Sequence, residues 1–285
     1  MGHPPFSNGV VKALRLLYWN TNQKDLSSQI SKAAKEFDID LLVLSEVNMS
    51  ASALLIALNS SSKWKYGLHI SPITETIILS RYPQKAVLSV YDSNGVTIRN
   101  VRPPIGIQFL LVAVHLGSKM YLSETEQALL VNEIIRNIAR IESEQGHKRS
   151  IVIGDFNMNP FEVGMISSET FHATMSSDIA TTAGRTVRGH FRDFFYNPMW
   201  NFLGDDNKPC GTYFYRKSTP NVFQWNLFDQ VLIRPDMIAY YDRGGTRIIS
   251  QIDTENLLNA SGTPNKKRFS DHLPIVVKID LKEGE

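Results

Sequence analysis

Two short acidic motifs, far apart in the chain, each stand beside a run of β-branched and aliphatic residues. Gly154-Asp155-Phe156-Asn157 follows the run 150–153, and Ser270-Asp271-His272 precedes the run 273–277. Such runs predict buried strands, and the glycine predicts a turn at the end of the first. A sheet holds polar groups at its strand ends rigidly while leaving them open to solvent. The two motifs therefore predict a fold that gathers acidic groups at strand ends, an arrangement suited to metal-assisted phosphate chemistry.

Further polar residues stand beside other apolar runs. They are Asn20 after 14–19, Glu46 after 40–45, His115 after 109–114, and Asp229 within 225–233. Taken singly, an Asn or Asp after a strand is most often a turn or capping residue, and a lone histidine is most often a hydrogen-bonded, partly buried one. Turn formation does not explain why every such run ends in a residue type that binds metals or transfers protons. The joint order therefore favours a shared catalytic function.

This ordered set resembles the endonuclease/exonuclease/phosphatase superfamily, whose familiar members include pancreatic-type deoxyribonucleases and abasic-site endonucleases. The resemblance extends from about Leu14 to Ile279, and its strongest parts are the Gly-Asp-Phe-Asn and Ser-Asp-His motifs. It implies a two-sheet α/β sandwich of the deoxyribonuclease-like kind, with helices on the outer faces and the site at one end of the sheets. The continuous alternation of strand and helix signals favours one domain over 1–285, with a core over about 14–280.

The candidate metal ligands offer oxygen atoms only. Glu46 is expected to be the principal ligand, with Asp271 and Asn20 nearby, and Asn20 is also a candidate substrate contact. A hard site with few carboxylates suits Mg²⁺, for which Mn²⁺ is an acceptable substitute.

The resemblance also implies catalytic roles. Asp155 would orient and deprotonate the attacking water, and Asn157 would stabilise the transition state as a neutral donor. His272 would donate to a phosphate oxygen, and Asp229 would fix the tautomer of the imidazole and raise its basicity.

Two further assignments rest on the resemblance to deoxyribonucleases. Glu75 is expected to orient His115, a second catalytic histidine, and Arg102 is expected to contact the substrate. The sequence departs from the family at Ser45, where many members carry Gln, and at Asn22, where several nucleases carry an acidic residue. The Trp-Cys-Asp-Arg signature of inositol polyphosphate 5-phosphatases is also absent, which disfavours a lipid phosphatase.

Composition constrains the disulfide content, the location and the binding partners of the protein. The 285 residues carry a formal net charge of +2 and a single cysteine, Cys210, so an intramolecular disulfide is excluded. The sequence shows no basic and apolar leader at its start and no run of about 20 apolar residues, which predicts a cytoplasmic protein without a membrane span. The basic run Lys266-Lys267-Arg268 and the loop residues Arg185 and Arg188 are either solvated loops or a rim that attracts a polyanion.

Periodicity predicts the main elements. Helices are expected over 25–37, 50–59 and 123–144, and strands over 64–70, 76–80, 85–91, 106–114, 211–215, 228–234 and 275–280. The segment 169–209 lacks sustained periodicity and carries aromatic residues that either stack on bases or anchor the segment to the core, with the second interpretation favoured.

The leading hypothesis is a Mg²⁺-dependent phosphodiesterase of nucleic acid, with DNA as the favoured substrate. The alternative is a phosphatase or phosphodiesterase of a small or lipid-linked phosphate ester on the same scaffold. A silent binding module is disfavoured, because every mapped position retains a competent residue type. Endonucleolytic and exonucleolytic action remain equally open at this point.

Overall fold

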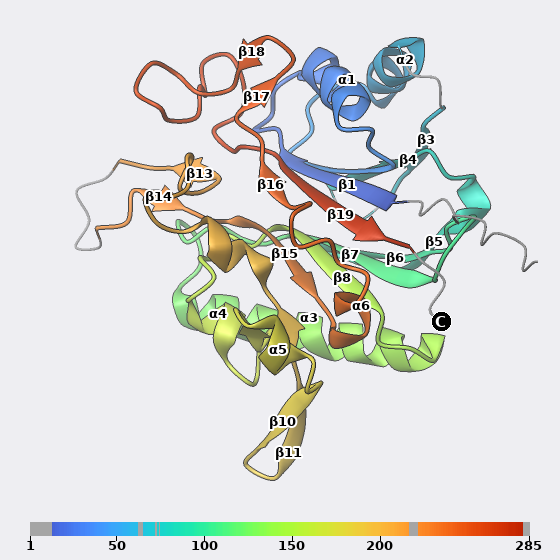
Figure 1. The fold of residues 1–285 in the computed structure, drawn as a ribbon, viewed down its shortest axis with the longest axis vertical. Helices are drawn as coiled ribbons and strands as arrows, with labels where there is room; N and C mark the ends of the chain where they lie inside the picture. The colour runs from blue at the N-terminus through green and yellow to red at the C-terminus, as the bar shows by residue number, and fades with distance from the viewer. Residues whose placement is uncertain (1–12, 62–64, 72, 74, 217–221, 282–285) are drawn as a thin grey trace, which may run out of the picture.

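The computed structural model describes residues 13–61, 65–71, 73, 75–216 and 222–281. Two large sheets face each other, and the longer helices cover their outer faces (Figure 1). This architecture confirms the expected two-sheet α/β sandwich. Within the described residues, no helix combines the length and the apolar character needed to cross a membrane.

The first sheet, called sheet A, has the strand order β16-β19-β1-β2-β4-β3. Its central strand β1 pairs in parallel with β2 and antiparallel with β19, so strands from the two ends of the described chain are neighbours. The bounds are β1 Ala13–Asn20, β2 Leu41–Ser45, β3 Gly67–His69, β4 Ile77–Ser80, β16 Arg247–Ile248 and β19 Ile275–Asp280.

The second sheet, called sheet B, has the strand order β5-β6-β7-β8-β15-β12-β9. Its centre is the parallel pair β7–β8, which is extended by the antiparallel strand β15. The bounds are β5 Val87–Ser93, β6 Val96–Val101, β7 Phe109–His115, β8 Ser150–Asp155, β9 Ala173–Thr174, β12 Phe195–Tyr196 and β15 Asp229–Ile233.

Alternating side chains on both sheets fill the space between them. Leu16 and Val43 of sheet A meet Leu111 and Ile153 of sheet B in one cluster of fully buried residues. Full burial of one such side chain stabilises the fold by about 1.5–3 kcal/mol. The two sheets are therefore fixed face to face, and groups at their ends keep a constant separation.

Helices cover the outer faces. The helices α1 (Ser27–Glu36) and α2 (Ala51–Ser61) pack on sheet A, and α3 (Glu124–Gln145) packs on sheet B. A capping box at Ser123 and Glu126 starts α3, and Gly146 in the left-handed conformation ends it.

Shorter elements complete the fold. A β-hairpin formed by β10 and β11 projects beyond α5 (Figure 1). The short elements are η1 Gln84–Ala86, α4 Val163–Ile166, α5 Ser177–Ala180, β10 Gly184–Val187, β11 His190–Asp193, η2 Pro198–Phe202, β13 Tyr213–Phe214, β14 Trp225–Asn226, α6 Pro235–Ile238, β17 Gln251–Ile252 and β18 Glu255–Asn256.

The structure corrects some expected elements. The strand β6 was not expected, because buried Arg99 and Asn100 interrupt its apolar pattern. The buried face of α3 contains Val131, Ile138 and Ile141, whereas Leu130, whose helical spacing to Ile138 and Ile141 predicts the same face, is 43% exposed. The strand expected over 64–70 is confirmed only over β3, and Trp64 lies outside the described residues.

The aromatic segment 169–209 is more ordered than its sequence indicates. It contains short strands and helices, and the side chains of Phe194, Phe195 and Tyr196 are buried. The favoured interpretation, that aromatics anchor this segment to the core, is confirmed for these three residues. Phe191, at 57% exposed, is not one of the anchors.

Candidate active site

Strand pairing brings the predicted residues to one end of the sandwich. In sheet A, Asn20 at the end of β1 is level with Ser45, which precedes Glu46. In sheet B, Asp155 at the end of β8 is level with both His115 of β7 and Asp229 of β15. Groups from segments that are distant in the sequence are therefore neighbours, as the strand-end argument predicts.

These residues border a cleft of about 1540 Å³. The sequence-predicted residues that line it are Glu46, Glu75, His115, Asp155, Asn157, Asp271 and His272. Asp229 lies behind them and is fully buried. The cleft is large enough for a phosphate ester together with part of the molecule attached to it.

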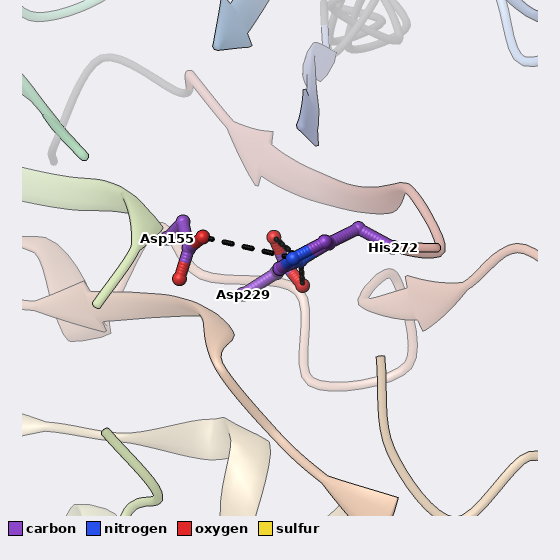
Figure 2. Close-up of side chains that lie close together, drawn as sticks. All are labelled: Asp155, Asp229 and His272. Atoms are coloured by element: carbon purple, nitrogen blue, oxygen red, sulfur yellow. Dashed lines mark hydrogen bonds and ion pairs between the residues drawn. The ribbon is translucent and has the colours of Figure 1, made fainter. Parts of the chain in front are cut away.

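His272 lies between two buried carboxylates (Figure 2). Its Nδ1 is 2.8 Å from Oδ2 of Asp229, and its Nε2 is 3.8 Å from Oδ2 of Asp155. Asp229 therefore fixes the imidazole, while the nitrogen on the other side of the ring faces Asp155. This is the histidine and carboxylate arrangement that the sequence analysis expects.

Burial and neighbouring charges together shift the pKa values of His272 and Asp155. Burial opposes the imidazolium form, but Asp229 and Asp155 outweigh burial and raise the pKa of His272 to about 10. Burial is also the main cause that raises the pKa of Asp155, with Asp229 adding to it and the His272 charge opposing it. At neutral pH the imidazole is a cation, and Asp155 is a stronger base than an exposed aspartate.

Glu46 forms a second acid–base pair, with His115. His115 Nε2 lies 3.3 Å from Glu46 Oε1, and both side chains are partly exposed to the cleft. The hydrogen bond from His115 is the main cause that lowers the pKa of Glu46 to about 2, although burial opposes it. Burial disfavours the His115 cation, but the hydrogen bond to Glu46 together with the charges of Asp155 and Glu46 outweighs burial and raises the pKa of His115. Glu46 is therefore ionised at neutral pH.

Asn20 joins the two acidic groups. Its Nδ2 donates to Glu46 Oε1 at 2.9 Å and to Asp155 Oδ2 at 3.1 Å, and its Oδ1 accepts from the backbone N–H of Asn22. The side chain is 1% exposed and presents its amide nitrogen to the carboxylates, and such a nitrogen does not ligate a metal. Asn20 thus bridges sheets A and B.

The ends of the strands show unusual backbone geometry. Glu46 and Asn157 have positive φ angles of 51° and 49°. A Cβ atom on Gly154 would lie 1.9 Å from the carbonyl oxygen of Val114, so only glycine permits this approach of β8 to β7. The backbone N–H of Asn157 donates to Asp155 Oδ1 at 2.8 Å, and its side-chain Nδ2 donates to the Leu116 carbonyl at 2.8 Å. The turn thus fixes Asp155 from its own segment.

Three supporting residues were missed by sequence reasoning. Ser270 Oγ donates to the Asn20 carbonyl at 2.6 Å and accepts from the His272 N–H at 3.0 Å. Trp19 Nε1 donates to the His272 carbonyl at 3.0 Å. The ring of Tyr213 packs against the His272 ring with centroids 4.7 Å apart. Serine before the Asp-His pair was the only available signal, because the other two contacts depend on tertiary packing.

Two of the expected residues are placed differently. Glu75 lines the cleft, but among the described residues no hydrogen bond joins it to His115, whose partner is Glu46. Arg102 follows the end of β6 that pairs with Phe109, whereas the other end of β6 pairs next to His115. The intervening strand is about 17–20 Å long, so Arg102 lies away from the cleft. Sequence order gave no information on strand direction at this position.

Comparison with known proteins identifies the family. The sequence profile of the Endonuclease/Exonuclease/phosphatase family matches residues 17–272. The chain belongs to this family. No protein of curated function matches the chain in sequence. As a member of the endonuclease/exonuclease/phosphatase family, the protein is a hydrolase of phosphate ester bonds.

Solved structures with the same fold cover nearly the whole chain. A family protein from Leptotrichia buccalis shares 14% identity at a TM-score of 0.56, covering 93% of this chain and 99% of its own. TDP2 of D. rerio with a single-strand DNA product shares 15% identity at 0.54, covering 94% and 98%. A 3′ phosphatase, NExo, from Neisseria with a product DNA hairpin shares 15% at 0.53, covering 94% and 99%. Because the sequence identities are only 14–15%, these similarities establish the fold alone.

The family member offers two sets of groups that could hold a divalent metal ion. One is the buried group Asp155, Asp229 and His272, whose ligand atoms lie within 4.8 Å of one another. A ligating imidazole must be neutral, however, and His272 is held as a cation by the same carboxylates. The other set, Glu46 and Asp271 at the cleft, offers hard carboxylate oxygens with access to solvent. The second set fits a hydrated Mg²⁺ ion better.

Proposed function

We propose that the protein is a Mg²⁺-dependent phosphodiesterase that hydrolyses nucleic acid, with DNA as the favoured substrate. The observation that carries this proposal is the position of His272 between Asp155 and Asp229, at the wall of a cleft that also contains Glu46. Hydrolysis of a phosphodiester needs an activated water and a positive charge near the phosphoryl oxygens. One cleft wall provides groups suited to both tasks.

Glu46 and Asp271 are the groups proposed to hold the metal. A divalent ion bound there would neutralise charge on the phosphoryl oxygens. Glu46 is suited to this task because the His115 hydrogen bond keeps it ionised, while part of its side chain faces the cleft.

Asp155 and His272 are the proposed acid–base groups. Asp155 would accept a proton from the attacking water, since burial gives its carboxylate a raised basicity. His272 would donate its Nε2 hydrogen to a phosphoryl oxygen, with Asp229 compensating the charge of the ring. Asn157, whose Nδ2 has a second hydrogen beyond the one given to Leu116, would donate to the same phosphate.

DNA is favoured over other esters for two reasons. Two of the similar structures, TDP2 and NExo, are complexes with DNA products. In addition, the run Lys266-Lys267-Arg268 is exposed and lies one residue before the Ser-Asp-His motif, whose Asp271 and His272 line the cleft. Such cations retain a polyanion through its phosphates.

A specific observation favours the alternative, a small or lipid-linked phosphate ester. Among the described residues that line the cleft, Lys119 is the one Lys or Arg, and its ammonium is bound to Glu162. A long polyanion would gain little from such a lining, whereas an ester with one phosphate needs only the catalytic groups.

A substrate screen distinguishes the two. Purified protein with Mg²⁺ is incubated with single-stranded DNA, duplex DNA, RNA, a phosphoinositide and sugar phosphates, across ionic strength. We expect nucleic acid cleavage that declines as salt rises. Release of phosphate from the small esters without cleavage of any nucleic acid would replace the proposed function by the alternative.

A further inference from the structure

The two borders of the cleft carry opposite kinds of surface. On the sheet A side, the cationic lip comprises Lys24, Lys266, Lys267 and Arg268, which lie outside the cleft lining but within three residues of the lining residues Asn22 or Asp271, apart from Lys266 and Lys267, which adjoin Arg268. The other, the α3 lip, comprises Met120, Tyr121, Glu124, Leu130 and Glu133 on the sheet B side. In Figure 1 the β17–β18 region and α3 lie on opposite sides of the sandwich. A substrate that crosses the cleft therefore meets two different environments.

The cationic lip is formed by two segments in contact. Lys24 follows the Asn22 turn, which lines the cleft, and its ammonium donates to the Lys266 carbonyl. Arg268 is 3.5 Å from Glu255, which neutralises part of its charge. Among the described residues no ion pair involves Lys24, Lys266 or Lys267. These ammonium groups can therefore bind phosphates without breaking an ion pair.

The α3 lip lacks available positive charge. Glu124 and Glu133 are exposed and line the cleft. Of the cations near this lip, Lys119 binds Glu162 and Arg140 binds Glu144 at 2.6 Å, while Arg136 lines a second pocket instead of the cleft.

Apolar surface accompanies these carboxylates. Met120 is 73% exposed and Tyr121 is 82% exposed, and both line the cleft together with Leu130. Exposed apolar side chains gathered at one site indicate a contact surface for an uncharged group.

We infer that the enzyme acts at the end of a nucleic acid strand rather than within it. This inference rests on the proposed function and adds which phosphodiester is cut. The strand that continues from the scissile phosphate lies along the cationic lip. The α3 lip takes a terminal group without further phosphates, because a continuing backbone would place phosphates beside Glu124 and Glu133 at distances within the Debye length of about 8 Å.

The reaction is an ordinary hydrolysis. Water adds to phosphorus, one P–O ester bond breaks, and the departing oxygen takes up a proton. The products are a shortened strand and a released terminal group, one of which keeps the phosphate.

The test compares substrates with and without ends. Linear single-stranded DNA labelled at one end and a covalently closed circle of the same sequence are incubated with the Mg²⁺-loaded protein. We expect release of short labelled products from the linear strand and a rate on the circle lower by at least about tenfold, because the carboxylates of the α3 lip repel a backbone that continues past them. Equal rates on circle and linear strand would overturn the inference while leaving the proposed nuclease function intact.

Charge variants test the cause of the preference. Glu124→Gln with Glu133→Gln should raise the rate on the circle, and the matched control Glu144→Gln, near the other end of α3, should not. Lys266→Ala with Lys267→Ala should weaken binding of the linear strand and flatten its salt dependence, whereas the control pair Lys65→Ala and Lys85→Ala should not. An unchanged ratio of circle to linear rates in the glutamate variant would count against the α3 lip. Absence of cleavage of any DNA would refute the proposed function itself.

Discussion

Asp155 and Asp229 are direct cross-strand neighbours on the antiparallel strands β8 and β15. Like charges in this position destabilise a sheet, and here both side chains are almost fully buried. His272 lies between them and compensates one of the two negative charges. The fold thus holds a buried group with an excess negative charge, which provides the basicity that the proposed chemistry requires.

Replacement of Asp155 by Asn should raise the stability of the protein while lowering its activity. The substitution keeps the volume and leaves the His272–Asp229 ion pair electrically balanced. Because the folded protein raises the pKa of Asp155, its ionised form costs stability at neutral pH. We expect the melting temperature to rise by about 2 °C or more while turnover falls by at least about 100-fold.

Calorimetry at two pH values checks the cause. The rise in melting temperature caused by Asp155→Asn should be present at pH 7. It should be absent below about pH 4, where the Asp155 carboxyl of the unsubstituted protein is protonated in both the folded and the unfolded state. A lower melting temperature at pH 7 would show that Asp155 stabilises the fold and contradict the argument.

A negative charge introduced at Asn20 should harm the protein more than truncation of the side chain does. Asn20→Ala removes the donor shared by Glu46 and Asp155 and should lower turnover on the order of 100-fold, because both carboxylates lose their fixed positions. Asn20→Asp puts a third carboxylate beside them and should be more harmful in both turnover and melting temperature. The Mg²⁺ concentration that gives half-maximal activity should rise in both variants. A fully active Asn20→Asp protein would contradict the bridging role.

Loss of the Glu46 charge should weaken the response to metal. EDTA should abolish activity, and excess Mg²⁺ or Mn²⁺ should restore it. Glu46→Gln should raise the Mg²⁺ requirement by about tenfold or more, since a ligating charge is lost. Glu144→Gln, an exposed change outside the cleft, is the control. Full activity in excess EDTA would remove the metal from the proposal.

His69 should make the protein less stable in mild acid. Burial lowers the pKa of His69 below 6.5, and the charge of Arg99 adds to the effect. The unfolded chain therefore takes up a proton first, and the free energy of unfolding falls as pH drops below about 6.5. His69→Gln retains a group that can bond to Ser80, the present partner of Nε2 at 2.8 Å. The difference in melting temperature between pH 7.5 and 5.5 should be smaller in this variant, and an equal difference would exclude His69 as a cause.

Residue types at strand ends were enough to predict that most of the candidate site would come together, and the family resemblance that they carry implied the two-sheet fold. The motifs around Asp155 and His272 are local, and the pairing of neighbouring strands places their ends side by side. The resemblance to the family implied Asp229 as the partner of His272, and the two side chains lie 2.8 Å apart.

Relationships that depend on strand direction or on packing were not predictable in this way. The distance of Arg102 from the cleft follows from the direction of β6, an unexpected strand whose buried Arg99 pairs with Asp92. The partner of His115 depends on the separation of the two sheets, which brings Glu46 closer to it than sequence order indicates. Leu130 likewise lines the cleft while the next residue, Val131, is fully buried, so one helical position decides between core and cleft.

The bridge from Asn20 to Asp155 has a consequence for protein synthesis. One end of the bridge is in β1 of sheet A and the other is in sheet B. His272 lies three residues before the start of β19, which pairs with β1. A growing chain on the ribosome thus lacks the imidazole proposed to act in catalysis until residues beyond 270 have emerged and β19 has joined β1. Partly synthesised chains should be unable to cut nucleic acid, so hydrolytic capacity arises only when the last strand has closed the central sheet.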